Sequence, residues 1–299
     1  MSAVLVLNSS NVTGNINSTY TYKFINGSYA IPEGSEICVS SAVIPYSFFN
    51  VSAQVYNNAT FSYNYPNNAG GFTTYTIILP NGFYLLSNIV QYIQNYMISL
   101  NQYLIRGTSN IYFIDLVSNS TYYTNTLFLY QVPTAANLAT LYPGATAPVG
   151  FVFPTISRMP TFTVLSTSAP FGSLIGFLPG TYGPSPNPPG GTTYSYNTNG
   201  NTVPNATPVN SLVLNCNLVN NLVTMPSNIM DSMPINATFG SNITYNATFE
   251  KWVPLTPGRY SNLIVNLLDQ NLNPVVCNDP NILITLLLRS PKKNVLKIY

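Results

Sequence analysis

The chain has 299 residues, which is enough for one large domain or two smaller ones. Only 5% of its residues are charged, against about 25% in an ordinary soluble protein, the net charge is +2, and histidine is absent. This composition argues against an enzyme, because general acid–base chemistry needs titratable groups, and against nucleic-acid binding by the body of the protein.

Short β-prone runs separated by turns extend along most of the chain. Asn-Gly pairs at residues 26–27 and 81–82 and Pro-Gly pairs at 143–144, 179–180 and 257–258 mark turns between them. This spacing predicts a β-sandwich or barrel. In residues 263–267 only Asn266 is polar, so we expect that strand to be buried on both faces or to lie in an interface. The predicted strands are 3–7, 19–24, 36–44, 54–63, 74–79, 111–116, 127–132, 161–165, 211–217, 262–268 and 282–289.

One segment, residues 87–100, has the apolar spacing of a helix instead. Ile89, Ile93 and Met97 recur at intervals of four, and Ser87 stands where an N-cap is expected. We expect an amphipathic helix that covers the mouth of the sandwich; a helix that docks a partner is the alternative.

Two later stretches are rich in loop-forming residues. Residues 179–210 contain mostly Pro, Gly, Asn, Thr and Tyr, which predicts a long loop or an insertion with little core of its own. Residues 133–160 are more apolar, so we expect them to pack against another part of the protein.

The residue types that carry chemistry are few and scattered, so we predict no catalytic, cofactor-binding or metal site. Asp279, followed by Pro280, is better explained as a turn-former before the last strand. The three cysteines do not have metal-binding or disulfide spacing and are expected to be buried small hydrophobic residues, as in a protein made in a reducing compartment. The carboxylates are Glu33, Glu36, Asp115, Asp231, Glu250, Asp269 and Asp279, and the cysteines are Cys38, Cys216 and Cys277.

The C-terminal end is basic. Arg289, Lys292, Lys293 and Lys297 are four of the nine basic residues, with no acidic residue among them. Two interpretations remain open. The end is either a solvated tail after the last strand or a short arm that contacts an acidic neighbour, nucleic acid or an anionic membrane.

Several blocks of sequence, taken in order, resemble a known family. The segment EICVSSAVIPYS at 36–47 is followed by YTIILPNGFY at 75–84, FGSLIGF at 171–177, YSNLIVNLLD at 260–269 and DPNILITL at 279–286. This order is similar to that in the penton and minor capsid proteins of virophages, Polinton-like viruses and related large double-stranded DNA viruses. The blocks extend over residues 36–289, most of the chain.

The resemblance implies an all-β fold, a single jelly roll of two antiparallel four-stranded sheets, with one helix and either an inserted outer β domain or long loops. In that arrangement residues 1–132 form the first part of the jelly roll, 133–210 a loop-rich region or insertion, 211–289 the closing strands and 290–299 a basic tail.

The function that the resemblance implies is structural. The chain would form a homopentamer at the vertices of an icosahedral capsid, bind the major capsid protein, and contact packaged nucleic acid or an inner layer through Arg289, Lys292, Lys293 and Lys297. Its expected location is the virion, after synthesis in the host cytoplasm. The alternatives are another minor capsid or cement protein, or a glycan-binding jelly-roll module.

Overall fold

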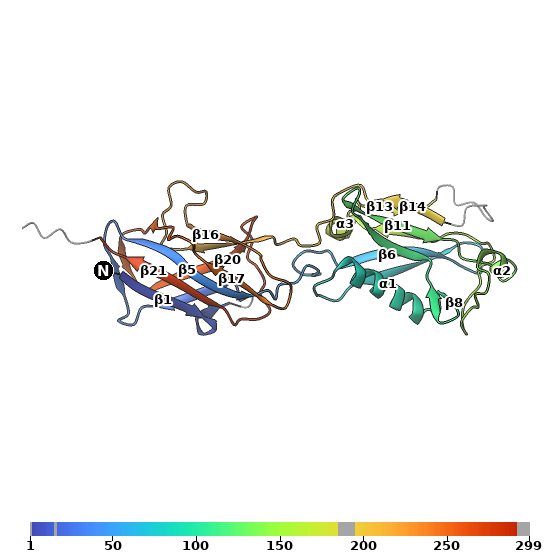
Figure 1. Ribbon diagram of the computed structural model, residues 1–299, viewed down its shortest axis with the longest axis horizontal. Helices are drawn as coiled ribbons and strands as arrows, with labels where there is room; N and C mark the ends of the chain where they lie inside the picture. Colours follow the sequence, from blue (N-terminus) through green and yellow to red (C-terminus); the bar gives the residue numbers. More distant parts are fainter. Residues whose placement is uncertain (1, 15–16, 185–194, 292–299) are drawn as a thin grey trace, which may run out of the picture. The chain divides into compact units, whose positions relative to one another are not determined.

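The computed structural model describes residues 2–14, 17–184 and 195–291 and divides the chain into two compact units (Figure 1). Unit 1 consists of Met1–Phe48 and Val209–Tyr299, and unit 2 is Phe49–Pro208. Strands make up 42% and helices 11% of the structure, which confirms the expected all-β class.

Unit 1 is built from two antiparallel sheets. The first has the order β1 (Ser2–Asn8), β21 (Leu283–Arg289), β5 (Glu36–Pro45), β17 (Asn242–Asn246), and β18 (Val253–Pro254) also pairs with β5. The second has the order β16 (Ile229–Pro234), β15 (Ser211–Cys216), β20 (Asn262–Asp269), β3 (Thr19–Lys23), β2 (Val12–Thr13). A short ribbon of β4 (Tyr29–Ile31) and β19 (Gly258–Tyr260) and the 3-10 helix η1 (Ser9–Asn11) complete the unit.

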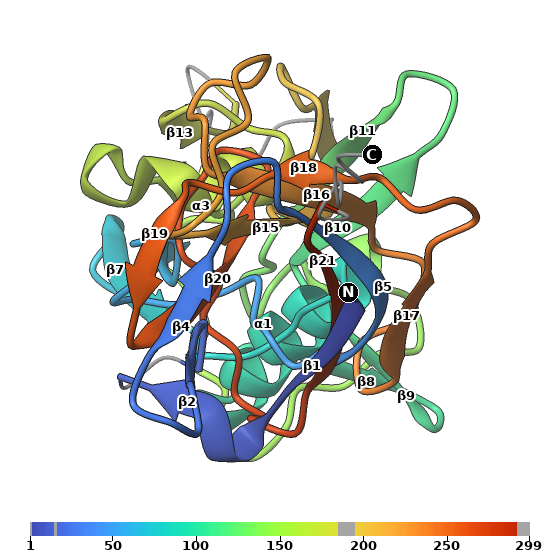
Figure 2. The ribbon, with the colours of Figure 1, turned by 90° about the vertical axis from the view of Figure 1, so that its left-hand side faces the viewer.

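The eight longest strands of unit 1 pair in a nested order. The first pairs with the last (β1 with β21), the second with the seventh (β3 with β20), the third with the sixth (β5 with β17) and the fourth with the fifth (β15 with β16). Two four-stranded sheets with this nesting form a jelly roll, so the expected fold is confirmed. All of these strands except β3 are labelled in the end view of Figure 2.

The core of the jelly roll follows the two-residue period of its strands. In β21, Ile284, Leu286 and Leu288 are buried, and in β20, Leu263, Val265 and Leu267 have no exposed surface. Each such side chain contributes roughly 1.5–3 kcal/mol when fully removed from water. The opposite face of β20 carries half-buried Ile264 and Asn266. That strand is therefore fully buried on one face and partly covered on the other, not buried on both.

Unit 2 is inserted between β5 and β15 of the jelly roll and has its own core. One sheet has the order β13 (Gly180–Tyr182), β12 (Thr161–Val164), β6 (Thr60–Pro66), β7 (Phe72–Ile78), and the other has the order β10 (Ile114–Asn119), β11 (Thr124–Tyr130), β14 (Ser195–Asn199). The unit also holds the hairpin β8 (Leu104–Arg106) to β9 (Ser109–Ile111), the helices α1 (Leu86–Ser99), α2 (Leu138–Leu141) and α3 (Ala169–Ile175), and the 3-10 helix η2 (Ser166–Ser168).

The described part of unit 2 holds three α-helices where one was expected, and of these α1 matches the predicted helix but differs in cap and in location. Its buried face consists of Ile89, Ile93 and Met97, as the spacing predicted. The N-cap is Leu85, not Ser87, and the side chain of Asn88 reaches back to accept a hydrogen bond from the Leu85 N–H at 2.9 Å. The helix packs against the core of unit 2, beside β10, and so belongs to the inserted unit and not to the jelly roll itself.

The insertion begins earlier in the chain than expected. Residues 49–132 belong to unit 2, whereas the sequence interpretation assigned them to the jelly roll. The reason is that β6 and β7 have the same alternation as jelly-roll strands, and a two-residue period does not reveal which sheet a strand joins. Residues 133–160 do pack against a core as expected: Leu138, Tyr142 and Phe151 lie against that of unit 2.

The stretch 179–210 is not only loop. It contains β13 and β14, and β14 pairs with β11 over five residues. The sequence SYNTN of β14 is polar on both faces, so its composition resembles a loop. Residues 185–194, in the same stretch, lie outside the described residues.

Candidate assembly surfaces

The outer face of the first jelly-roll sheet is apolar near its edge strand β1. Val4, Val6 and Leu283 are 62%, 41% and 45% exposed, and half-buried Leu287 lies directly opposite Val4 across the strands. We call these four residues the apolar outer face. None is charged, and β1 is an edge strand. Proteins usually protect edge strands with charges or cover, so this surface has the properties of a contact surface.

The same sheet carries a chain of charged and aromatic contacts. Arg289 Nε lies 2.6 Å from Glu36 Oε2, and its guanidinium lies 4.1 Å from the ring centroid of Trp252. The Trp252 indole N–H donates to Glu250 Oε2 at 3.0 Å. Because both members of the Glu36–Arg289 pair are part-exposed, the pair contributes little to stability and serves to order this patch.

This contact corrects the interpretation of the basic tail. Arg289 is the last residue of β21 and faces Glu36, the first residue of β5, so its charge is already paired within the fold. Lys292, Lys293 and Lys297 lie outside the described residues. Contact of the tail with nucleic acid or an inner layer therefore remains a prediction, and Arg289 is not free to provide it.

A second ionic cluster lies where β16 meets β17 at one edge of the sandwich. Lys251 Nζ is 2.8 Å from Asp231 Oδ1, and the Tyr245 hydroxyl donates to the other carboxylate oxygen. The Asp231 side chain is 5% exposed and that of Lys251 is 43% exposed. The hydrogen bond to Asp231 raises the pKa of the Lys251 ammonium, while burial and then Asp231 raise that of the Tyr245 hydroxyl. The Lys251 ammonium and the Tyr245 hydroxyl therefore keep their protons at neutral pH, as in a structural cluster.

Three of the other carboxylates accept hydrogen bonds from backbone N–H groups. Asp269 Oδ1 accepts from the N–H groups of Asn271 and Asn273 at 2.8 and 2.9 Å, and Asp279 Oδ1 accepts from Asn281 N–H at 2.9 Å. Asp279 is thus the turn-former that the sequence predicted. Asp115 Oδ1 accepts from the next N–H in the chain, and burial raises the pKa of its carboxyl. Within the described residues, no group of three or more His, Cys, Asp or Glu side chains could hold a metal ion.

All three cysteines are free and buried, as expected. Burial raises the pKa of Cys216 to about 11 and that of Cys277 to about 12, and it also raises that of Cys38. The thiolate is the reactive form of cysteine, so these side chains are unreactive packing groups at neutral pH.

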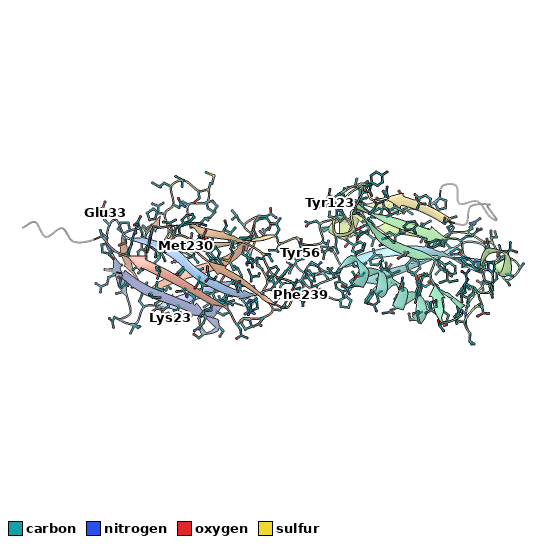
Figure 3. All side chains as sticks on the ribbon, in the orientation of Figure 1. Lys23, Glu33, Tyr56, Tyr123, Met230 and Phe239 are labelled. Carbon is teal, nitrogen blue, oxygen red and sulfur yellow. The ribbon has the colours of Figure 1, made fainter. Side chains whose placement is uncertain are left out.

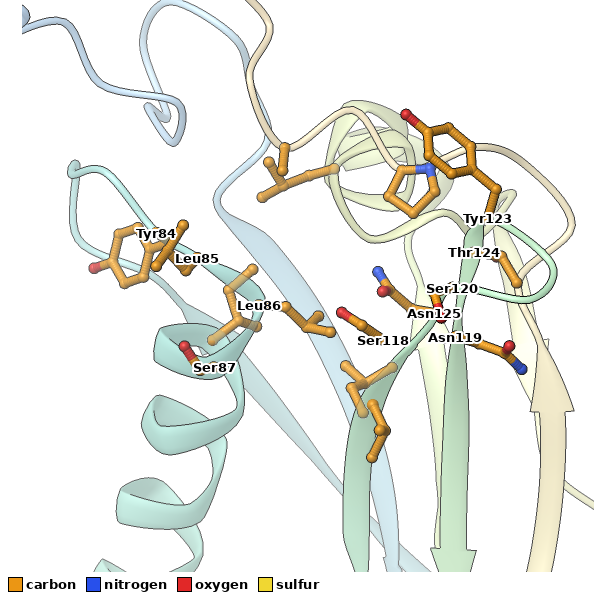
Figure 4. Close-up of a pocket in the computed structure, with 16 residues that line it drawn as sticks. Tyr84, Leu85, Leu86, Ser87, Ser118, Asn119, Ser120, Tyr123, Thr124 and Asn125 are labelled. Carbon is orange, nitrogen blue, oxygen red and sulfur yellow. The ribbon is translucent and has the colours of Figure 1, made fainter. Parts of the chain in front are cut away.

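Unit 2 contains a pocket of about 670 Å³ between the start of α1 and the β10–β11 hairpin (Figure 4). Its walls include Leu86, Ile89, Leu116 and Leu174, and none of its lining residues is charged. Tyr123, labelled in Figures 3 and 4, stands at the hairpin turn, is 74% exposed and has a left-handed backbone with φ of 51°. The pocket can receive an uncharged, mainly apolar group and offers no acid, base or metal ligand to it.

Comparisons with known proteins found structural similarity only. No protein-family model and no curated protein matches the sequence. Among solved structures, the chain is similar to the mavirus penton protein, with 8% identity, a TM-score of 0.40 and coverage of 97% of this chain and 98% of that one. It is also similar to a chain of the Sputnik virophage structure, with 14% identity, a TM-score of 0.39 and coverage of 96% and 97%.

Sequence reasoning missed the cluster of Asp231, Tyr245 and Lys251. A signal was present, since Lys251 is the only lysine between residues 24 and 291, but the adjacent Glu250 is the partner that the sequence alone suggests. The partner Asp231 could not be identified because it lies 20 residues earlier, on β16, and only the fold brings the two side chains together. Within the residues that the structure describes, no helix is long and apolar enough to cross a membrane.

Proposed function

We propose that this chain is a structural capsid protein that forms a homopentamer at the vertices of an icosahedral shell and closes the gaps between major capsid capsomers. The observation that carries the proposal is the nested eight-strand jelly roll of unit 1, found in a chain whose ordered sequence blocks resemble the penton family. Jelly rolls are frequent in viral capsids, but they also occur in lectins and enzymes. The sequence blocks and the surface chemistry are therefore needed to distinguish a capsid protein from a lectin or an enzyme.

The surface chemistry supports assembly rather than catalysis. The apolar outer face and its edge strand are uncharged, and the described carboxylates Asp231, Asp269 and Asp279 are engaged by side chains or turns. Contacts between neutral surfaces avoid the cost of burying unpaired ions. Their strength depends only weakly on salt. These are the properties that a shell component needs to associate in varied surroundings.

A ring of five copies needs one heterologous interface repeated by rotation until it closes. In this proposal unit 1 provides the ring, as its edge strand β1 carries the apolar outer face. The protein resides in the virion after synthesis in the host cytoplasm. The partners are further copies of the chain and the major capsid protein.

Co-expression with the major capsid protein, followed by electron microscopy of the assembled particles, tests the proposal. Density for five copies of this chain at the vertices is expected. Particles with this chain between other capsomers, or with none of it, would reject the vertex assignment.

A further inference from the structure

A short loop between β15 and β16 of unit 1 presents three apolar side chains to solvent. Leu222, Val223 and Met225 are 83%, 91% and 95% exposed. We call residues 221–227 the apolar loop. Single exposed apolar residues are ordinary on protein surfaces, but three in four positions at this exposure are typical of a contact site.

The apolar loop satisfies its polar groups internally. The Asn221 N–H donates to the Ser227 carbonyl at 2.6 Å, which closes the loop, and Asn221 Oδ1 accepts from the Val223 N–H at 3.3 Å. The Thr224 hydroxyl donates to the Pro226 carbonyl at 3.0 Å. The loop is therefore ordered before it meets a partner, and docking its apolar side chains costs little additional conformational entropy.

An apolar groove lies between β1 and the β3–β4 connection of the same unit. It has a volume of about 270 Å³, and its walls include Leu5, Phe24, Ile25, Tyr29 and Leu288. The rings of Phe24 and Tyr29 stack with centroids 5.2 Å apart, and none of the lining residues is charged. The volume is below the roughly 300 Å³ at which small-molecule sites begin, so the groove suits protein side chains better than a soluble ligand.

The apolar loop and the groove lie at the same end of the jelly roll but at opposite edges. Cys216 lies just before the loop and pairs with Val265 of β20, and Val265 in turn pairs with Tyr20 of β3. Phe24 of the groove follows β3 directly, so the loop and the groove lie at the same end of this sheet. The loop leads into β16, which is three strands from β3 in the sheet, roughly 15 Å at ordinary strand spacing. The labels of β16 and β1 stand on opposite sides of unit 1 in Figure 1. No residue of the loop lines the groove of its own copy.

We propose that the apolar loop of one copy seats in the groove of the next copy, so that Leu222, Val223 and Met225 pack against Phe24, Ile25 and Tyr29 of the neighbour. Two complementary, uncharged surfaces on opposite edges of one domain form a heterologous interface, and such an interface closes into a ring when the rotation between copies allows it. The proposal deepens the assembly role proposed above and rests on it, since it names the surfaces through which copies associate.

The first test removes the apolar surface of the loop without touching the core. The triple variant Leu222→Ser, Val223→Ser, Met225→Ser should weaken self-association at least ~10-fold by sedimentation velocity, because truncating a cluster of anchors removes much of the binding energy. At concentrations low enough for both to be monomeric, its melting temperature should equal that of the native chain. Ile25→Asp, at a residue that is 92% exposed at the groove, should have the same effect. Val149→Ser is the matched control, since Val149 is 97% exposed in unit 2.

The second test detects the contact itself. One chain carries Met225→Cys and the other Ile25→Cys, and the two are mixed and oxidised. Disulfide-linked heterodimers are expected, while Met225→Cys mixed with Val149→Cys should yield none. Absence of the first cross-link, or equal association by the loop variant and the native chain, would overturn the proposal.

The outcomes separate this inference from the capsid assignment. Pentamers that persist in both the loop and the groove variants would reject the loop–groove contact and leave the capsid role standing. A native chain that forms loop–groove dimers or open filaments but no pentamer would support the contact and reject the vertex role. Loop-dependent binding to lipid vesicles without any change in self-association would reassign the loop to a membrane surface and overturn the proposal.

Discussion

Replacement of Lys251 by methionine should destabilise unit 1 more than neutralisation of its partner Asp231. Removing Lys251 leaves a carboxylate that is 5% exposed, with the Tyr245 hydroxyl as its only side-chain donor. Loss of one member of a buried ion pair costs about 3–5 kcal/mol, and the remaining tyrosine bond places this variant near 3 kcal/mol. Asp231→Asn instead leaves an ammonium group that is 43% exposed and can be hydrated, so its cost should be about 1 kcal/mol.

The two costs can be measured by chemical and thermal unfolding followed by circular dichroism. For a domain of this size 1 kcal/mol corresponds to roughly 3 °C, so Lys251→Met should lower the melting temperature by about 9 °C and Asp231→Asn by about 3 °C. The double variant has no buried charge to compensate and should be more stable than Lys251→Met alone. Equal costs for the two single variants, or a double variant that is the least stable of the three, would refute this reasoning.

Three further predictions concern single groups and the tail. Because burial raises the pKa of Asp115 above its ordinary value of 3.8, the folded state binds its proton more tightly, and stability from this group is lost as pH rises through the folded pKa. Asp115→Asn should therefore raise the melting temperature at pH 7 but not at pH 3, and a decrease at pH 7 would contradict this. Cys38, Cys216 and Cys277 should react with a thiol reagent only after unfolding; fast reaction of the native chain would show that one is accessible. Deletion of residues 290–299 should leave the melting temperature nearly unchanged but lower incorporation into particles in a salt-dependent way, and equal incorporation at all salt concentrations would show that the tail is only a solvated end.

Local elements with strong periodicity could be predicted from the sequence alone. Helix α1 and strands β5, β20 and β21 were located to within one or two residues, because apolar spacing reports a buried face directly. β14 and β17 were missed, since their sequences SYNTN and NITYN are mostly polar and resemble turns. Their place in a sheet is decided by pairing with distant strands.

An inserted domain was one of the two expected alternatives, but the residue at which it begins could not be predicted for a related physical reason. β6 lies only about fifteen residues after β5 and has the same strand signals, yet it pairs within unit 2. Which strands pair depends on side chains that meet across the chain, and a single sequence does not contain that information. The same limit explains why Arg289 was interpreted as part of a free tail, although its partner Glu36 is 253 residues away.

The candidate surfaces were predictable in kind but not in place. A chain with so few charges must expose mainly neutral side chains, and Val4, Leu222 and Met225 are exposed apolar examples. Their locations follow from the edges of the jelly roll, which only the fold reveals.

The mass of the purified chain in solution tests the central claim most directly. Native mass spectrometry across a range of concentrations and salt should show a species of five chains, about 164 kDa from five times 32.7 kDa, with little change between low and high salt. A chain that remains a monomer or dimer at all concentrations, or a ring of another number, would contradict the proposal that it forms the fivefold vertex of a shell.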